Sequence, residues 1–317
     1  MEQQWGWLIV IYLFLGGLGA GAYLTSFAAS KGYLGNAPAL SRIGYFVAAP
    51  VVAIGTALLV FDLGQGLKKP WLLIGLLSNP KSVMTWGVYI LSGFIAVGLV
   101  VAFLAWKKKE IPNVLAIIGA FLAISTAAYT GLLISVVKEV PIWNTFLMPV
   151  LFVISALSTG LSLTVLLGHL LEKDAESNEK FVCKVHLILV LVEVAVLAIF
   201  LGLMISGANG AVAAKSANMI VSGSLALPFW AILVGAGLAF PLVAQSVRMT
   251  QLSKAPMLVA TAASTAEQAI AEQAATGHAY SASTSVLVSD FCVLLGGFVL
   301  RYVVILAAIP IWNGMLG

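Results

Sequence analysis

Eight long apolar stretches dominate this sequence, and short polar segments separate them. Each stretch runs for 19 to 26 residues, which at about 1.5 Å per residue spans the roughly 30 Å hydrocarbon layer of a bilayer. None shows the polar face that a surface helix of a soluble protein carries. The pattern predicts an all-α integral membrane protein with eight transmembrane helices, at residues 7–29, 43–61, 83–106, 114–137, 146–171, 185–207, 225–247 and 286–309.

Composition agrees with this pattern and suggests the domain organisation. Hydrophobic residues form 61% of the 317-residue chain and charged residues only 9%, whereas a soluble domain has roughly 25% charged residues. Four spans precede and four follow the loop at 139–143. We therefore expect one polytopic membrane domain over 1–317, built as two four-helix bundles at 1–138 and 139–317.

Basic residues between the spans predict the orientation. The side that holds both termini carries five Lys or Arg residues in its loops, and the opposite side carries ten. Because an excess of Lys and Arg marks the cytoplasm, we expect a multi-pass protein of a prokaryotic cytoplasmic membrane with both termini outward. The cluster 107–109 (KKK) is then a topology anchor, and the net charge of +4 does not indicate nucleic-acid binding. The longest loop, 248–285, is expected to be disordered or to form a surface helix.

Ligands for redox metals are scarce. Cys183 and Cys292 are too few and too far apart for an iron–sulfur or zinc site. His169 ends the fifth span and His186 opens the sixth, so both are expected near one membrane face, where a haem between them is unfavourable. We therefore expect no haem or metal in this chain.

Polar residues of the first four spans converge at one depth on the outward side. Because helix direction alternates, the start of spans one and three and the end of spans two and four meet there. An acid, phenols, hydroxyls and an indole in an apolar wall suit a quinone headgroup, which needs hydrogen-bond donors for two carbonyls and protons for its reduction. The candidates are Tyr12, Asp62, Ser82, Trp86, Ser125 and Tyr129, and Ser125 and Tyr129 share a helix face because they are four residues apart.

Each of these residues also has a purely structural interpretation. Trp86, like Trp143, can belong to the aromatic belt at the membrane interface, and so can Tyr129. Asp62 can cap the end of its span or pair with the lysines at 68 and 69. The glycine pair Gly17–Gly21 fits either close helix packing or close approach of the backbone to a cofactor.

Glu193 and Arg301 lie well inside spans six and eight. Counted from the inner side at about 1.5 Å per residue, they lie roughly 12 and 22 Å deep. A charge at such a depth is costly without a partner or a polar cavity. The two residues are therefore either a structural charge pair or part of a proton path, and their difference in depth requires water or a tilted geometry between them.

Six short motifs, in order along the chain, resemble the NrfD-like membrane anchors of polysulfide reductase and related molybdenum or multihaem oxidoreductases. The resemblance covers essentially the whole chain. The motifs are YLFLGGLGAG at 12–21, FDLG at 61–64, SVMTWG at 82–87, YTG at 129–131, PIWN at 141–144 and GGFVLRY at 296–302.

This resemblance implies an eight-helix, quinone-reactive subunit of a respiratory oxidoreductase complex, with menaquinone or ubiquinone as its cofactor. It implies an outward-facing iron–sulfur partner, which exchanges electrons with a molybdopterin-type or multihaem catalytic subunit in anaerobic respiration. By motif position the family's quinone site corresponds to Tyr12, Asp62 and Tyr129. The chain departs from the pattern in span one, where the polysulfide reductase member has His at the position of Tyr12 and Asn at that of Ile9.

The favoured hypothesis is quinone or quinol chemistry at the outer membrane face. Tyr129 would donate a hydrogen bond to a carbonyl, Asp62 would exchange protons with the headgroup, and Tyr12 would make a further polar contact. The 62–82 loop would contact the iron–sulfur partner through Lys68, Lys69 and Lys81. Two rivals remain: a solute or ion transporter with Glu193 and Arg301 along its pathway, and an anchor that binds no quinone.

Overall fold

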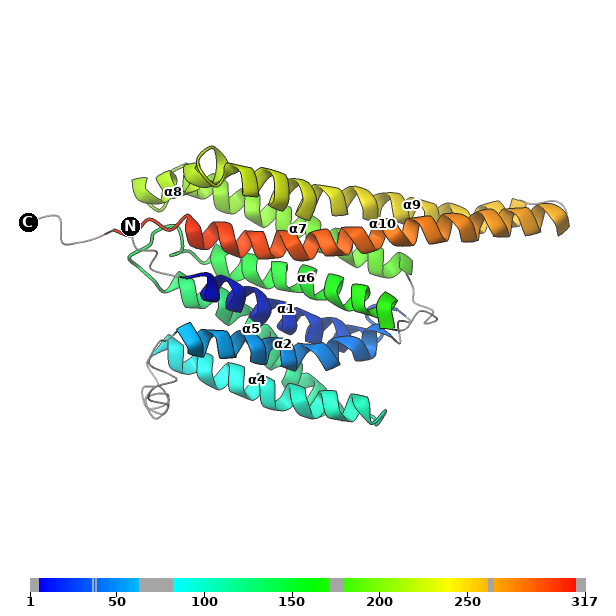
Figure 1. Ribbon diagram of the computed structural model, residues 1–317, viewed down its shortest axis with the longest axis horizontal. Coiled ribbons are helices and arrows are strands. Elements are labelled where there is room, and N and C mark those ends of the chain that lie inside the picture. The colour runs from blue at the N-terminus through cyan, green and yellow to red at the C-terminus, as the bar shows by residue number, and fades with distance from the viewer. Residues whose placement is uncertain are drawn as a thin grey trace, which may run out of the picture.

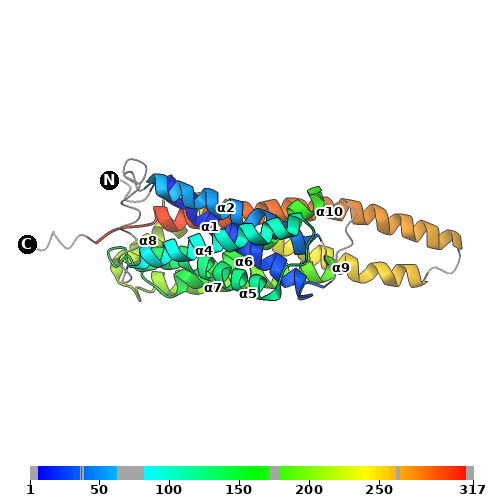
Figure 2. The ribbon, with the colours of Figure 1, turned by 90° about the horizontal axis from the view of Figure 1, so that it is seen from below.

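A computed structural model describes residues 6–35, 37, 39–62, 82–171, 179–261 and 265–311, with side chains except those of 62, 179, 254–261 and 265–283. Within these ranges the chain is helical and has no strand (Figures 1 and 2). The elements are α1 (Trp7–Ser30), α2 (Leu40–Asp62), α4 (Val83–Trp106), α5 (Asn113–Ser135), α6 (Leu147–Leu171), α7 (Glu179–Ile205), α8 (Ala211–Val221), η1 (Pro228–Ala239), α9 (Phe240–Thr261) and α10 (Thr265–Leu306).

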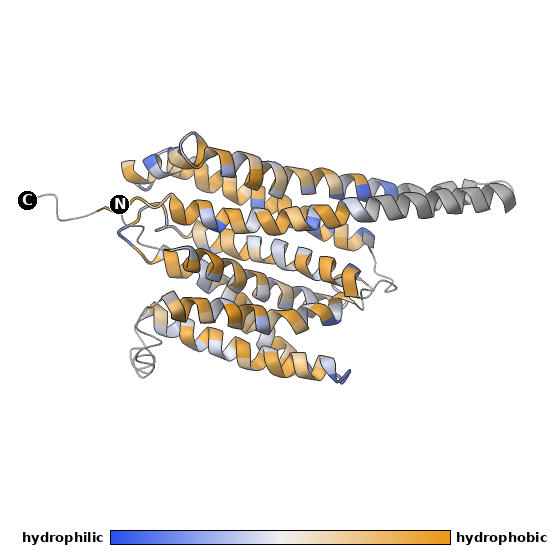
Figure 3. Cartoon of the chain, in the orientation of Figure 1, coloured by the Kyte–Doolittle hydropathy of each residue, from blue (hydrophilic) through white to orange (hydrophobic). Residues whose placement is uncertain are grey.

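Eight segments of these helices are long and apolar enough to cross a membrane, which confirms the predicted all-α polytopic fold. Their outer surfaces carry many large apolar side chains, and hydrophobic residues predominate along the described helices (Figure 3). A bilayer accepts such a surface, whereas water does not. The chain is therefore a multi-pass membrane protein.

In the segment 248–285, expected to be disordered or a surface helix, the described residues 248–261 and 265–285 extend two membrane helices. α9 continues to Thr261, and α10 begins at Thr265. Both helices run past the ends of their neighbours (Figures 1 and 2). Among the residues with described side chains, the seventh and eighth apolar spans are Pro228–Ser253 and Thr284–Leu306. Continuous helical hydrogen bonding thus carries the chain beyond the apolar part of each span.

Helices α1 and α6 join the first four spans to the last four. α1 packs against α2, α5, α6 and α10, and α6 also contacts α5, α7 and α10. A close crossing lies at Gly21, where an added Cβ would overlap the carbonyl group of Ala156 and approach Gly160. Gly21 therefore serves helix packing, the structural interpretation of the glycine motif, because only a residue without a side chain admits this approach.

Span seven begins as the π-helix η1 rather than as an α-helix. A π-helix, with its i→i+5 hydrogen bonds, is rare in proteins. Gly237 of η1 faces Gly296 of α10, and a Cβ on either residue would lie 2.6 Å from the other's Cα. This glycine pair lets α10 approach span seven closely and sets the spacing between them.

Trp143 does not belong to the aromatic belt that the sequence suggested. Its side chain is buried, and its Nε1–H donates to the carbonyl of Val304 at 2.8 Å. Val304 lies in the last turn of α10, where carbonyls have no partner within the helix. Trp143, in the loop that precedes α6, therefore supplies a hydrogen-bond donor to the C-terminal end of α10.

Candidate functional site

Tyr12 and Tyr129 meet at the end of the bundle that holds the start of α1 and the end of α5. Tyr12 is the sixth residue of α1, and Tyr129 lies six residues before the end of α5, so the antiparallel helices bring them to one depth. Both side chains are buried, and they are close enough to interact electrostatically. The hydroxyl of Tyr12 has no hydrogen-bond partner among the described residues. A buried donor without an acceptor costs about 1–3 kcal/mol, so this position favours a bound acceptor.

Gly87 shapes the wall beside Tyr129. A Cβ added at Gly87 of α4 would overlap the phenol ring and hydroxyl of Tyr129. On the other side, Gly16 of α1 lies against Thr130. A Cβ added at Gly16 would be 3.1 Å from the methyl carbon of Thr130. The absence of two side chains thus makes room for the two tyrosines between α1, α4 and α5.

The remaining predicted quinone ligands do not all face this point. Trp86 is 56% exposed on the outside of the chain, where its ring lies edge-on to Tyr89. Ser125 donates its hydroxyl hydrogen to Phe121 O within its own helix at 2.8 Å. Ser82 is the residue before α4 and makes no side-chain cap. The roles of Trp86, Ser125 and Ser82 in binding a headgroup stay predictions.

Asp62 is the last residue of α2, at the same end of the bundle as Tyr12. Its side chain lies outside the described residues, and so do Lys68, Lys69 and Lys81, the predicted contacts for a partner subunit. Their roles stay predictions.

Arg301 is completely buried between α1, α6 and α10. One nitrogen, Nη1, donates to Ser155 Oγ and to Gly297 O, both at 2.7 Å. The guanidinium also lies over the rings of Phe14 and Phe152, with its central carbon 5.9 and 5.1 Å from the ring centroids. Its Nε and Nη2 have no hydrogen-bond partner in the described part of the chain. The cation is thus held by two aromatic faces and two oxygens, with two nitrogens unpaired.

Glu193 reaches the same place from α7. Its carboxyl group is buried close to the hydroxyls of Ser155 and Ser158 and interacts electrostatically with Arg301. No direct ion pair joins the two residues, both of which are described. Ser155 therefore stands between the two charges as a shared neighbour.

The length of the arginine side chain explains how the two residues meet despite their different depths. Side chains of a helix point toward its N-terminus, and Arg301 bonds to Gly297, one turn back along α10. A turn corresponds to about 5.4 Å, so the guanidinium lies nearer the level of Glu193 than its own Cα does. This offsets about half of the depth difference of roughly 10 Å estimated from the sequence.

A second buried polar cluster surrounds His186, about two turns along α7 from Glu193. His186 Nε2 lies 3.1 Å from Ser162 Oγ of α6. Its Nδ1 lies 3.3 Å from Gln245 Nε2 of α9 and 3.3 Å from Asp290 Oδ1 of α10. Neither oxygen of Asp290 has a hydrogen-bond partner of good geometry within the described ranges. Four helices thus contribute to one site that can hold and exchange a proton.

One face of α6 connects the two clusters. Ser155, Ser158 and Ser162 follow one another at spacings of three and four, so they line one helix face. We call the whole set the buried seam; its members are Ser155, Ser158, Ser162, His186, Glu193, Gln245, Asp290 and Arg301, all buried. The hydroxyl of Ser158 lies close to the Glu193 carboxyl group but forms no hydrogen bond of good geometry among the described residues.

The sequence interpretation missed most of this seam. The sequence places His186 near a membrane face, and the structure adds that its ring is buried within the bundle against Ser162 and Asp290. His169 is the other histidine considered for a haem. Its Nδ1 lies 3.0 Å from the carbonyl oxygen of Val165 in the same helix. The available signal is Asp290, an acid four residues inside the predicted eighth span, where an unpaired carboxylate is also unfavourable.

Comparison with known proteins identifies the family. Residues 1–272 match the family described as polysulphide reductase, NrfD. The chain belongs to the NrfD family. It is 33% identical over 264 residues to the C subunit of polysulfide reductase from Wolinella succinogenes, an alignment that covers 75% of this chain and 82% of that protein. It is also 29% identical over 270 residues to protein NrfD of Escherichia coli, covering 75% and 83% of the two chains. The resemblance inferred from the short motifs is confirmed.

The NrfD match contains both tyrosines and Glu193 but ends before Asp290 and Arg301. The tyrosine pair therefore lies wholly within the region shared with the NrfD family. The α10 side of the buried seam lies beyond that region, and only the three-dimensional packing connects it to the rest of the site.

Proposed function

We propose that this protein is the quinone-reactive membrane subunit of a reductase complex and that Tyr12 and Tyr129 bind the quinone headgroup. The observation that carries the proposal is the buried hydroxyl of Tyr12, which lacks an acceptor among the described residues and lies beside a second phenol. A quinone carbonyl is an acceptor that suits this position. Its negative charge grows on reduction, and hydrogen bonds from phenols stabilise such charge strongly where water is scarce.

Asp62 would supply the proton that accompanies each electron, because it ends α2 on the same side of the bundle. The electrons would come from, or pass to, an iron–sulfur subunit and through it a molybdopterin-type or multihaem subunit. Membership in a family that includes a polysulfide reductase subunit supports such a partnership. The quinone would be menaquinone or ubiquinone, and the tyrosine pair would lie toward the outer face.

Quinol-linked turnover in membranes that contain the whole complex tests this proposal. Tyr12→Phe and Tyr129→Phe keep the rings but remove the donors, so turnover should fall by about tenfold or more. Tyr23→Phe is the matched control. Tyr23 is as deeply buried as Tyr12 but lies nearer the other end of α1, where its hydroxyl donates to Ala116 O of α5. Activity with soluble artificial electron carriers should survive all three changes. Unchanged quinol turnover in both test variants would place the quinone elsewhere.

A second candidate function is proton movement through the chain, and the buried seam specifically favours it. His186 and Glu193 lie seven residues apart on α7, about 10.5 Å along the helix. Hydroxyls of Ser158 and Ser162 lie along this interval on the facing helix. Ionisable groups buried in a membrane protein commonly mark such pathways.

Proton uptake into vesicles that contain the complex separates this function from quinone binding. Glu193→Gln and His186→Ala should abolish proton uptake while quinol oxidation continues. If uptake persists in both variants at normal turnover, the seam is only structural.

A further inference from the structure

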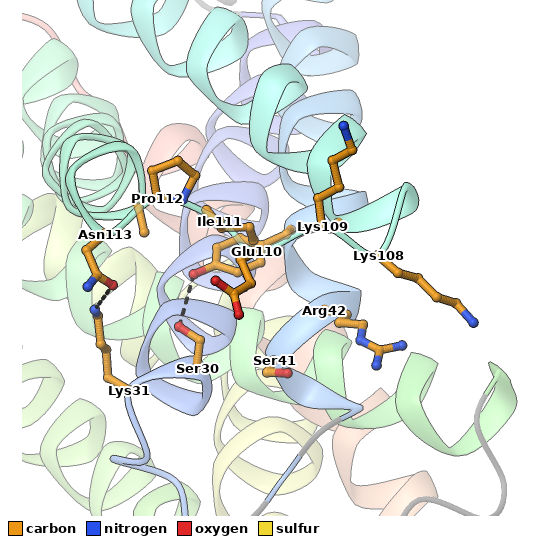
Figure 4. A pocket seen from close by; sticks show the side chains of 13 residues that line it. Ser30, Lys31, Ser41, Arg42, Lys108, Lys109, Glu110, Ile111, Pro112 and Asn113 are labelled. Atoms are coloured by element: carbon orange, nitrogen blue, oxygen red, sulfur yellow. Dashed lines mark hydrogen bonds between the residues drawn. The ribbon is translucent and has the colours of Figure 1, made fainter.

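A basic hollow lies at the opposite end of the first four spans from the tyrosine pair. Its volume is about 680 Å³, and its wall is formed by the end of α1, the start of α2, residues 108–112 after α4 and the start of α5 (Figure 4). We call it the basic pocket. Its polar and charged lining consists of Ser30, Lys31, Ser41, Arg42, Tyr45, Lys108, Lys109, Glu110 and Asn113.

The charges around this pocket are unbalanced. Four cationic side chains and one carboxylate, that of Glu110, line it. Within the described residues Arg42, Lys108 and Lys109 form no ion pair and no side-chain hydrogen bond, so Glu110 does not neutralise them. The pocket therefore presents a net charge of three positive units, and its field is that of an anion site.

The floor of the pocket offers hydrogen-bonding groups. Tyr45 is almost fully buried, and its hydroxyl lies 3.3 Å from Ser30 Oγ. Lys31 Nζ donates to Asn113 Oδ1 at 2.7 Å, which holds this cation at the pocket wall (Figure 4). Hydroxyl groups and cationic side chains around one hollow suit the oxygens of a phosphate group.

An exposed apolar surface lies beside this anion site. Phe103 and Trp106, in the last turn of α4, are 54% and 67% exposed, and Val114 at the start of α5 is 70% exposed. Lys107 lies over the first two rings, with Nζ 5.7 and 5.3 Å from their centroids. A free phosphate ion makes no favourable contact with an apolar surface, whereas the acyl chains of a phospholipid pack against it.

We propose that the basic pocket binds the headgroup of an anionic phospholipid, whose tails lie along the outer faces of α4 and α5. Each Lys or Arg near a membrane surface contributes about 1 kcal/mol to the binding of anionic lipid, which corresponds to about a fivefold change in affinity. The bound lipid would fasten the ends of four helices that are joined here by short loops. The proposal is independent of quinone chemistry and requires no particular orientation in the membrane.

The matched control lies next to the pocket in sequence. Lys107→Gln and Lys108→Gln remove the same charge from the same loop, but only Lys108 lines the pocket. A lipid attracted by diffuse surface charge would respond equally to both changes. A lipid seated in the pocket would respond only to the second.

Native mass spectrometry of the purified full-length protein, titrated with phosphatidylglycerol or phosphatidylcholine, measures the binding. We expect phosphatidylglycerol to bind preferentially, Arg42→Gln and Lys108→Gln to weaken it about fivefold each, and Lys107→Gln to change it less than about twofold. Glu110→Gln should strengthen binding by a similar factor, a gain that misfolding cannot produce. Millimolar inorganic phosphate should not displace the lipid.

Three results would overturn the proposal. Equal binding of the two lipids would show that charge is not recognised. Equal losses in Lys107→Gln and Lys108→Gln would show that the pocket is not the site. Displacement by inorganic phosphate would assign the pocket to a soluble phosphate group instead of a lipid.

Discussion

Glu193 and Arg301 approach each other through Ser155 rather than through a direct ion pair. Arg301 Nη1 donates to Ser155 Oγ at 2.7 Å, and the carboxyl group of Glu193 lies close to the same hydroxyl. A small polar side chain on α6 thus connects charges from α7 and α10. Since Nη2 and Nε of Arg301 are unpaired within the described ranges, the guanidinium retains donors for a further hydrogen-bond acceptor.

Removal of Arg301 alone should damage the protein more than removal of both charges. Arg301→Met leaves Glu193 buried without its cation, and breaking a buried charge pair in this way costs about 3–5 kcal/mol. The double variant Arg301→Met/Glu193→Gln should recover part of that loss. The midpoint of thermal unfolding in detergent, measured for the two single variants and the double variant, gives the coupling. Strictly additive effects would mean that the residues are independent.

Displacement of Tyr129 without changing it provides a further test of the quinone site. In Gly87→Ala the new methyl group would overlap the phenol of Tyr129, so the ring must shift. We expect quinol-linked turnover to fall about tenfold or more, as for loss of a positioned hydrogen-bond donor. Gly93→Ala on the same helix is the control, because its methyl group would meet only the side chain of Leu122 at 3.6 Å. Equal turnover in the two variants would argue against the role of Tyr129.

Trp143→Phe should destabilise the protein by about 1–3 kcal/mol, because the carbonyl of Val304 then loses its donor in a buried place. Trp106→Phe provides the comparison, since Trp106 is 67% exposed and its replacement keeps a ring beneath Lys107. The control should change stability by less than about 0.5 kcal/mol. Chemical or thermal unfolding in one detergent measures both variants, and similar losses would show that the hydrogen bond is unimportant.

The predicted orientation can be tested with two reporter fusions. The five-to-ten distribution of basic residues predicts that alkaline phosphatase fused at the C-terminus is active, because that enzyme requires the periplasm. The same reporter inserted in the loop at 107–112 should be inactive. The opposite result would reverse the predicted membrane orientation and place the tyrosine pair at the cytoplasmic face.

The sequence by itself determined the class of fold, because hydropathy over about 20 residues depends only on composition and helix rise. All eight predicted spans overlap spans of the structure. Buried charges were equally visible, since Glu193 and Arg301 interrupt apolar stretches where charge is expensive. The depth of Tyr12 and Tyr129 followed from the alternation of helix direction, which made their meeting predictable.

Only the tertiary structure decided which faces of the helices meet. Rotation and spacing of neighbouring helices are set by side-chain packing, as at Gly21 against Ala156 and at Gly237 against Gly296. Hydropathy contains no information on that rotation. His186 and Asp290 stand more than 100 residues apart in the sequence, so their contact becomes visible only when α6, α7, α9 and α10 are packed together.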